Sequence, residues 1–276
     1  YASISGFGQD GPYAERPGFD QIAQGMGGLM SITGAPGEGP MRVGIPIADL
    51  TAGLFAAQGI FIALLEREDS GKGQWVHTSL LQAQIFMLDF QASRWTMSGE
   101  VAGQAGNNHP TSIPTGAFKT SDGFINLAVS GGEIWQRCAK VLGREDLIDN
   151  PDYKTGGDRS RNRDTLNAVI QEILEQKSSG EWVDAFNAAG VPCGPIYAIN
   201  EVFEDPQVQH LGMARDVASP TLGRDIALIN QPIMMSRTPT AMASHPPDPG
   251  EQSDEILGEL GLSAAEIDDL RARRVI

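Results

Sequence analysis

Cysteine is scarce in this chain: Cys138 and Cys193 are the two that occur among 276 residues. Neither lies in a CxxC motif or a metal-spaced cluster, so we expect buried thiols in a reducing, cytoplasmic environment. The four histidines also lack the spacing of metal ligands, which argues against a zinc site. We therefore expect no bound metal and no tightly bound cofactor, and we find no signal peptide.

Basic residues are also few: Lys and Arg number 20 against 35 Asp and Glu, giving a net charge of −15. This excess of negative charge argues against a nucleic-acid partner. A polyanionic ligand would need a local cluster of cations, for which Arg16, Arg42 and Lys72 are candidates unless they are solvated surface. No apolar run reaches the ~20 residues that a membrane span needs, so we expect no membrane association.

One carboxylate stands immediately before the longest apolar run. Asp49 lies in the stretch Gly44–Gly53, and residues 50–65 contain no charged side chain. A run of this length, rich in Gly and Ala, predicts a helix that is buried on nearly all sides. Asp49 would lie near its first turn, where free N–H groups and the helix dipole favour an anion. Two interpretations stay open: Asp49 caps a core helix, or its carboxylate sits in a partly dry pocket and does chemistry.

Strands and helices alternate in the first part of the chain, which indicates an α/β layer with parallel strands. A break rich in Gly, Asn and Pro follows, and the hairpin and helices beyond it are typical of a small α+β domain. We divide the chain into 1–98, 99–212 and 213–276, the last holding a linker and two C-terminal helices. The expected strands cover 1–7, 74–79, 116–120 and 124–129; the expected helices cover 19–32, 50–71, 80–97, 133–142, 158–176 and 180–189, with a turn over 191–195.

Two loops have the composition of ligand-binding segments. Gln104–Pro110 has Gly, Asn and His residues that can turn tightly, donate hydrogen bonds and move, but an interdomain linker shares this composition. Ser130–Gly132 ends a strand and opens a helix, so its backbone N–H groups could hold an anion or simply form a turn. Neither a GxGxxG nor a GxSxG motif is present.

Several short motifs, each weak alone, form an ordered set that covers nearly the whole chain. The motifs are Ile4–Pro12, Pro17–Asp20, Ile47–Gly53, Gly71–Gln74, Asn108–Pro110, Thr120–Gly123, Gly190–Pro195 and Glu255–Gly261. In that order and spacing they resemble the class III coenzyme A transferases, the family of formyl-CoA transferase, carnitine CoA-transferase and α-methylacyl-CoA racemase.

The resemblance implies an architecture: a Rossmann-like large domain completed by the C-terminal helices, a smaller α+β domain, and an interlocked homodimer. It further implies that Asp49 is the catalytic aspartate and that coenzyme A is a co-substrate. Members of the family carry an N-terminal segment that supplies part of the CoA pocket. Because the present chain opens directly on its first strand, we expect the large domain to be incomplete at the N-terminus.

The chemistry suits an isolated aspartate. A carboxylate has a reference pKa near ~4 and needs no general base at neutral pH. It can attack the thioester of an acyl-CoA to give a mixed anhydride, then an aspartyl-CoA thioester that an acceptor carboxylate attacks. Arg42 and His109 could meet the second carboxylate of a dicarboxylic acid. We expect substrate binding at Phe19, Gly106, Asn107, Asn108 and His109, and CoA binding at Arg16 and Arg42.

A loop that closes over the intermediates would exclude water. Gln104–Pro110 occupies the place of the glycine-rich loop of formyl-CoA transferase. This chain has Asn and His at positions where that loop has mostly glycine. The resemblance therefore does not imply that Gln104–Pro110 closes over the intermediates in the same way.

Two alternatives remain from the sequence. A racemase of the family needs a paired acid and base. The resemblance implies that such racemases have a His in the segment that matches residues 18–20, where this chain has Phe19. Phe cannot transfer a proton, which favours transfer over racemisation. The other alternative is an inactive, truncated CoA-binding fragment.

Overall fold

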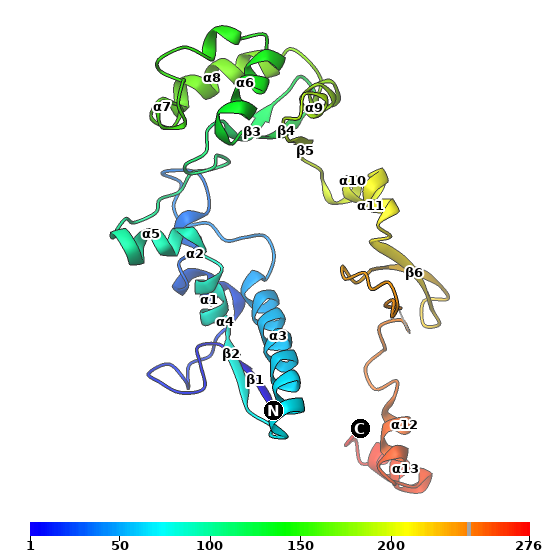
Figure 1. The fold of residues 1–276 in the computed structure, drawn as a ribbon. Helices are drawn as coiled ribbons and strands as arrows, with labels where there is room; N and C mark the ends of the chain where they lie inside the picture. The colour runs from blue at the N-terminus through cyan, green and yellow to red at the C-terminus, as the bar shows by residue number, and fades with distance from the viewer. Residues whose placement is uncertain (242–243) are drawn as a thin grey trace. The chain divides into compact units, whose positions relative to one another are not determined.

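The computed structural model describes residues 1–241 and 244–276 and divides the chain into two compact units, Tyr1–Ile196 and Tyr197–Ile276 (Figure 1). Each unit has its own strands and helices. The three-part division drawn from the sequence, with boundaries after residues 98 and 212, stays a prediction beside this two-unit division.

The first unit begins with a parallel strand pair, as predicted. Strand β1 (Ala2–Ser5) pairs with β2 (Val76–Ser79) in the register Ala2↔Val76 to Ser5↔Ser79. The long helix α3 (Ile47–Ser70) lies between them in the chain and packs on both strands. Parallel strands need a crossover of this kind, so the α/β class is confirmed.

Small side chains bring the helices of this layer close together. Helices α1 (Asp20–Met26), α3 and α4 (Leu80–Phe86) pack on one another. Their shared core consists mainly of alanine, which allows the helix backbones to approach closely. The buried members are Ala23, Ala48, Ala52, Leu80 and Ala83.

Three helices predicted as continuous, over 19–32, 80–97 and 158–176, are broken. The last divides at Asn162 into α7 (Gly156–Arg161) and α8 (Arg163–Leu174), and the other two break at residues of positive φ. The first splits into α1 and α2 (Leu29–Ile32) at Gly27 and Gly28, and Gly28 has a φ of 86°. The second splits into α4 and α5 (Phe90–Ser98), with Asp89 at a φ of 51°. A left-handed residue cannot continue a right-handed helix, so the apolar periodicity ran through each break without revealing it.

The prediction that the helix after Asp49 is buried on nearly all sides is wrong. The buried residues of α3 are Ala48, Thr51, Ala52 and Ala56, because α1 and α4 cover only its small-residue face. Large apolar side chains project from the rest, including Leu54, Phe61 and Leu65, which are 70%, 65% and 72% exposed.

Helix α3 is also longer than the apolar run that we read as too short for a membrane span. It has 24 residues and an 18-residue window of mean hydropathy 1.7, of which 22% is buried. Length and composition alone would therefore allow it to cross a membrane. A helix that another protein surface covers meets the same criteria.

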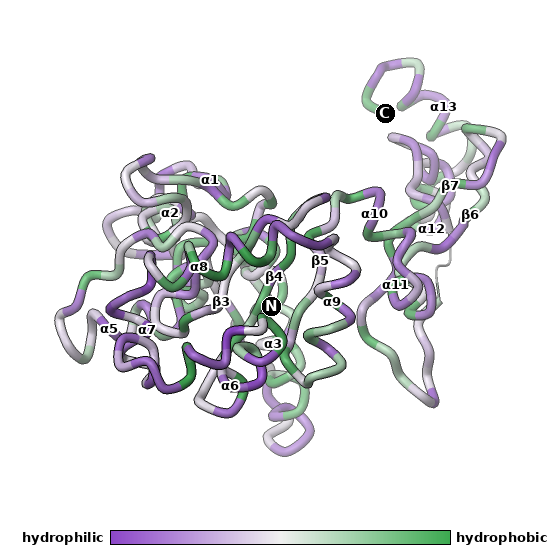
Figure 2. Tube along the Cα trace, turned by 90° about the horizontal axis from the view of Figure 1, so that it is seen from above, coloured by the Kyte–Doolittle hydropathy of each residue, from purple (hydrophilic) through white to green (hydrophobic). Residues whose placement is uncertain are grey.

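The second half of this unit is built on an antiparallel sheet of order β3-β4-β5. Strands β3 (Thr115–Lys119) and β4 (Phe124–Ala128) form the predicted hairpin, and β5 (Cys193–Pro195) replaces part of the predicted turn. The hydrophobic residues of β4 can be followed in Figure 2. Large buried side chains from the sheet and its helices, including Trp135, Leu166 and Phe186, form one core. The helices are α6 (Gly131–Val141), η1 (Glu145–Leu147), α7 (Gly156–Arg161), α8 (Arg163–Leu174) and α9 (Ser179–Ala188).

The second unit contains a two-stranded antiparallel sheet and short helices. A capping box of Ser263 and Glu266 is present at the start of the last helix. The elements are α10 (Ile199–Glu204), α11 (Pro206–His210), β6 (Ala214–Ser219), β7 (Arg224–Ile229), α12 (Ser253–Glu259) and α13 (Ala264–Ala272).

Candidate active site

The N-terminus of α3 is held by a buried carboxylate from another helix. Asp20, at the start of α1, is 8% exposed, and its Oδ1 accepts a hydrogen bond of 2.9 Å from the backbone N–H of Ala48. Its Oδ2 accepts a 2.8 Å bond from Gln24 Nε2. Because the first N–H groups of a helix lack intrahelical acceptors, Asp20 performs the capping that we considered for Asp49.

Gln24 extends this support to the segment that leads into α3. It is fully buried and accepts a 2.9 Å bond from the N–H of Val43 while donating a 3.2 Å bond to the carbonyl of Ile45. The segment immediately before α3 is therefore hydrogen-bonded to α1. The direction of the first turn of α3 follows from these contacts.

Asp49 lies in that first turn with its side chain exposed. Within residues 1–241 and 244–276, its carboxylate takes part in no internal hydrogen bond or ion pair. The expected partly dry pocket around it is therefore not formed by this chain alone. An exposed carboxylate at the positive end of a helix is free to meet a substrate.

The expected CoA-binding arginines have separate partners. Arg42 Nη2 lies 3.8 Å from Asp20 Oδ2, with its side chain 43% exposed. The guanidinium carbon of Arg16 lies 3.6 Å from the centroid of the Tyr13 ring, a cation–π contact. Phe19 directly precedes α1 and is 77% exposed. Arg42 thus lies beside the carboxylate that anchors α3, whereas Arg16 is held within its own loop.

The Gln104–Pro110 loop makes specific contacts at both ends. At its start, Gln104 Nε2 donates bonds of 2.7 Å and 2.6 Å to the carbonyls of Thr33 and Gly39, and Gly106 N–H donates a 3.0 Å bond to the carbonyl of Gly34. These bonds join it to the segment between α2 and α3. The loop is thus tied to the part of the chain that leads to Asp49.

The other end of the loop joins the small antiparallel sheet. The carbonyl of Asn107 accepts from Ala117 N–H at 3.2 Å, and His109 N–H donates to the carbonyl of Thr115 at 2.8 Å. The imidazole of His109 stacks on Phe90 of α5, with ring centroids 6.0 Å apart and an interplanar angle of 16°. The residues from Asn107 to His109 therefore have defined positions between α5 and β3.

The cysteines, the Ser130 turn and the possible metal ligands have no feature that favours a catalytic or binding role. Burial raises the pKa of the Cys138 thiol to about 12 and that of Cys193 to about 11, so both thiols are protonated at neutral pH and are weak nucleophiles. Ser130 begins α6 without a side-chain cap. Across the described residues, no three His, Cys, Asp or Glu side chains gather as metal ligands would.

Sequence reasoning missed Asp20, Gln24 and Phe90 as supporting residues of this region, and it named Gln104 as the start of the candidate loop without its bonds to Thr33 and Gly39. Asp20 did lie in one of the quoted motifs, but its bond to Ala48 spans 28 residues. A carboxylate at a helix start reads as a cap of its own helix, and no local pattern shows that it caps a distant one.

Comparison with known proteins identifies the family of the chain. The model of CoA-transferase family III matches residues 1–253. The chain belongs to this family. The resemblance inferred from the ordered motifs is therefore confirmed.

Named members of the family are similar over most of the chain. Human succinyl-CoA:glutarate CoA-transferase is 34% identical over 94% of this chain, and succinate–glutarate CoA-transferase of Agrobacterium fabrum is 36% identical over 94%. The chain spans 59% and 65% of the lengths of these two proteins.

A solved structure supports the fold. A CAIB/BAIF family protein from Brucella suis is 33% identical, with a TM-score of 0.81, over 94% of this chain and 67% of that one.

Proposed function

We propose that the protein transfers coenzyme A from an acyl-CoA to a carboxylic acid, with Asp49 as the nucleophile. The observation that carries the proposal is the family match over residues 1–253 together with the position of Asp49. Its carboxylate is exposed in the first turn of α3, where the free N–H groups favour negative charge. The Asp20 and Gln24 contacts hold this turn without engaging Asp49 itself.

The proposed reaction proceeds by a series of acyl exchanges. An Asp49 oxygen attacks the thioester carbonyl, the C–S bond breaks, and a mixed anhydride and CoA thiolate form. The thiolate attacks the Asp49 carbonyl carbon, which releases the first carboxylate and leaves an aspartyl-CoA thioester. The acceptor carboxylate then displaces the thiolate to form a second anhydride. Attack of the thiolate on the acceptor's acyl carbon gives the new acyl-CoA and restores Asp49.

Small dicarboxylic acids are the substrates that we favour. Two relatives are named for succinate or succinyl-CoA and glutarate. In this chain, Arg42 is half-exposed beside the α3 N-terminus and could pair with the carboxylate that does not react. Phe19 and the Gly106–His109 segment would complete the acid-binding surface, and Arg16 would meet the phosphates of CoA.

We also propose that the active form is an interlocked homodimer. The uncovered apolar side chains of α3 support this, since exposed apolar patches of this kind mark protein contacts. The same coverage would make the surroundings of Asp49 drier than they are in one chain. The racemase alternative gains no support, because Phe19 offers no proton and the named relatives are transferases.

The proposal is tested by incubating the protein with succinyl-CoA and glutarate and following glutaryl-CoA by mass spectrometry. Asp49→Asn should lower the exchange rate by at least about 10³-fold, because the nucleophile is removed. Asp69→Asn makes the same change near the other end of α3 and should keep the wild-type rate. Absence of exchange with any acid tried, or full exchange by Asp49→Asn, would refute the proposal.

A second measurement looks for the intermediate. With succinyl-CoA and no acceptor, the intact wild-type protein should gain the mass of one CoA less one water as succinate leaves, and peptide mapping should place the adduct on Asp49. No adduct should form on Asp49→Asn.

A further inference from the structure

Two side chains of α8 hold the loop that carries His109. Arg163 Nη2 donates hydrogen bonds to the carbonyls of Pro110 at 2.6 Å and His109 at 3.3 Å. Asn167 Nδ2, one helical turn further on, donates a 2.9 Å bond to Asn108 Oδ1. Three successive loop residues are thus bound by one face of one helix, since positions i and i+4 of a helix lie on the same side.

The ring of His109 is oriented by the backbone that follows it. Its Nδ1 accepts hydrogen bonds from the N–H groups of Thr111 and Ser112, at 3.2 Å and 3.0 Å. A ring nitrogen that accepts two N–H donors cannot carry the hydrogen of a neutral imidazole, so that hydrogen is on Nε2. The stack on Phe90 fixes the plane of the ring. Nε2–H is consequently a donor with a set direction.

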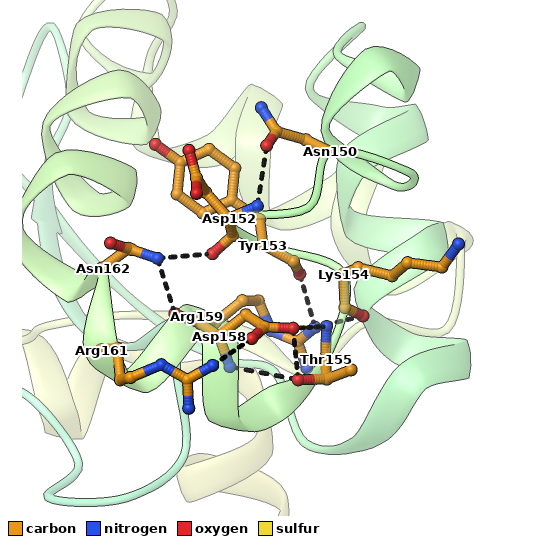
Figure 3. A network of polar contacts seen from close by, with 9 residues as sticks. All are labelled: Asn150, Asp152, Tyr153, Lys154, Thr155, Asp158, Arg159, Arg161 and Asn162. Carbon is orange, nitrogen blue, oxygen red and sulfur yellow. Dashed lines mark hydrogen bonds and ion pairs between the residues drawn. The ribbon is translucent and has the colours of Figure 1, made fainter.

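The start of α8 is itself fixed, which makes it a firm anchor. Asn162 Nδ2 donates to the carbonyls of Asp152 and Asp158, and Arg159 Nη1 donates to the carbonyl of Tyr153 (Figure 3). Arg159 is buried, and its Nε also donates a 2.8 Å bond to the carbonyl of Ile113. The chain that follows the loop is therefore joined to α7, the helix that immediately precedes α8.

The charge around the loop favours an anion. The ion pairs nearby join Arg161 to Asp158 and Lys154 to Asp149, and none among the described residues includes Arg163. Arg163 Nε is buried without a hydrogen-bond partner. Among the described residues, the guanidinium therefore has backbone carbonyls rather than a carboxylate as its partners. An N–H donor on a loop held by such a guanidinium suits a carboxylate oxygen better than a cation or a thiol.

We infer that Arg163 and Asn167 are positioning residues that present His109 Nε2–H as a preformed donor to the carboxylate of the acceptor acid. The inference rests on the proposed function for the identity of the acid. It differs from the closing glycine-rich loop that the resemblance suggested, because hydrogen bonds already hold Asn108, His109 and Pro110. Specificity would then come from a rigid donor of fixed position, which costs less ordering entropy on binding than a mobile loop does.

The first test is independent of activity. Long-range ¹⁵N–¹H spectra of histidine-labelled protein report the tautomer of each ring, and His109→Gln identifies the His109 signal by its loss. The wild-type ring should be the Nε2–H tautomer, and titration with glutarate should shift its Nε2–H signal. Arg163→Met and Asn167→Ala should each give a ring that averages between tautomers. Arg161→Met, which removes a neighbouring charge without a loop contact, should leave the signal as it is.

The second test is kinetic. His109→Gln keeps an N–H donor near the Nε2 position, and the KM for glutarate should stay within a few-fold of wild type. His109→Phe keeps a ring to stack on Phe90 but has no donor, so this KM should rise roughly 10- to 100-fold, as for a lost hydrogen bond to a charged group. The KM for succinyl-CoA should be unaffected by either change.

The outcomes separate this inference from the proposed function. An Nδ1–H ring in the wild type, an unshifted Nε2–H signal with glutarate, or an unchanged tautomer in both Arg163→Met and Asn167→Ala would overturn the inference even if CoA exchange is found. Absence of CoA exchange together with the expected spectra and shift would overturn the proposed function and leave His109 as a carboxylate-binding donor.

Discussion

At the scale of single residues, one buried side chain is in an unfavourable environment. Gln84 of α4 is fully buried, and within the described residues neither its Nε2 nor its Oε1 has a hydrogen-bond partner. Its side chain packs tightly on α1, since a Cβ placed on Gly27 would lie 2.5 Å from Gln84 Cγ. A buried amide without partners costs free energy, whereas its packing contributes favourably.

We therefore expect Gln84→Met to stabilise the protein. Met has a similar shape and no hydrogen-bonding groups to leave unpaired, so the free energy of unfolding should rise by about 1–3 kcal/mol. Urea denaturation followed by circular dichroism measures this change. Gln207→Met makes the same substitution at an exposed position of α11 and should be nearly neutral. A destabilised Gln84→Met would mean that the amide has a partner in the working protein.

At the scale of elements, the start of α3 depends on a contact between helices. Asp20→Ala would leave the N–H of Ala48 and the amide of Gln24 without their acceptor in a buried place. We expect a loss of about 1–3 kcal/mol in the free energy of unfolding. Asp20→Asn keeps one acceptor oxygen for Ala48, so its free energy of unfolding should fall less. Asp10→Ala, on an exposed loop, is the control.

If Asp20→Ala and Asp10→Ala have equal free energies of unfolding, the contact between Asp20 and α3 contributes nothing to stability.

The same contact shows which elements the sequence can predict. The start of α13 was predictable because Ser263 and Glu266, the two members of its capping box, are three positions apart. The start of α3 is fixed by a residue 28 positions away, and no local pattern marks such a partner. The short strand β5 was read as a turn because two of its three residues are Gly and Pro. It forms because it pairs with β4 from Ile125 to Leu127, and the pairing is flanked by hydrogen bonds from Ala128 N–H to the Pro192 carbonyl and from Ile196 N–H to the Phe124 carbonyl.

The residues of the candidate site also differ in whether the sequence can predict them. Asp49 and the His109 loop were predictable because their residues are contiguous in short motifs. Phe90, Arg163 and Asn167 were not, because tertiary packing alone brings them to that loop. Apolar periodicity also failed for α3: it identifies a helix that needs covering, but not whether the same chain supplies the cover.

At the scale of the whole molecule, that uncovered helix face calls for a partner. Leu54, Phe61 and Leu65 are 70%, 65% and 72% exposed, and their spacing of seven and four places them along one side of α3. Fully burying one such side chain contributes about 1.5–3 kcal/mol. Three or more together would contribute a large part of the free energy of a protein interface, so a second copy of the chain is the partner that we propose.

Sedimentation velocity should accordingly show a particle of twice the chain mass at micromolar concentration. The double variant Phe61→Glu and Leu65→Glu should shift the protein toward monomer by at least ten-fold in the dissociation constant, because two carboxylates would have to be buried at the contact. Leu222→Glu, an equally polar change at another exposed apolar position of the chain, should leave the dimer intact. Since α3 also carries Asp49, loss of the dimer should lower CoA exchange in parallel. A wild-type protein that remains monomeric at these concentrations, or a double variant with an unchanged dissociation constant, would exclude α3 as the surface through which two copies associate.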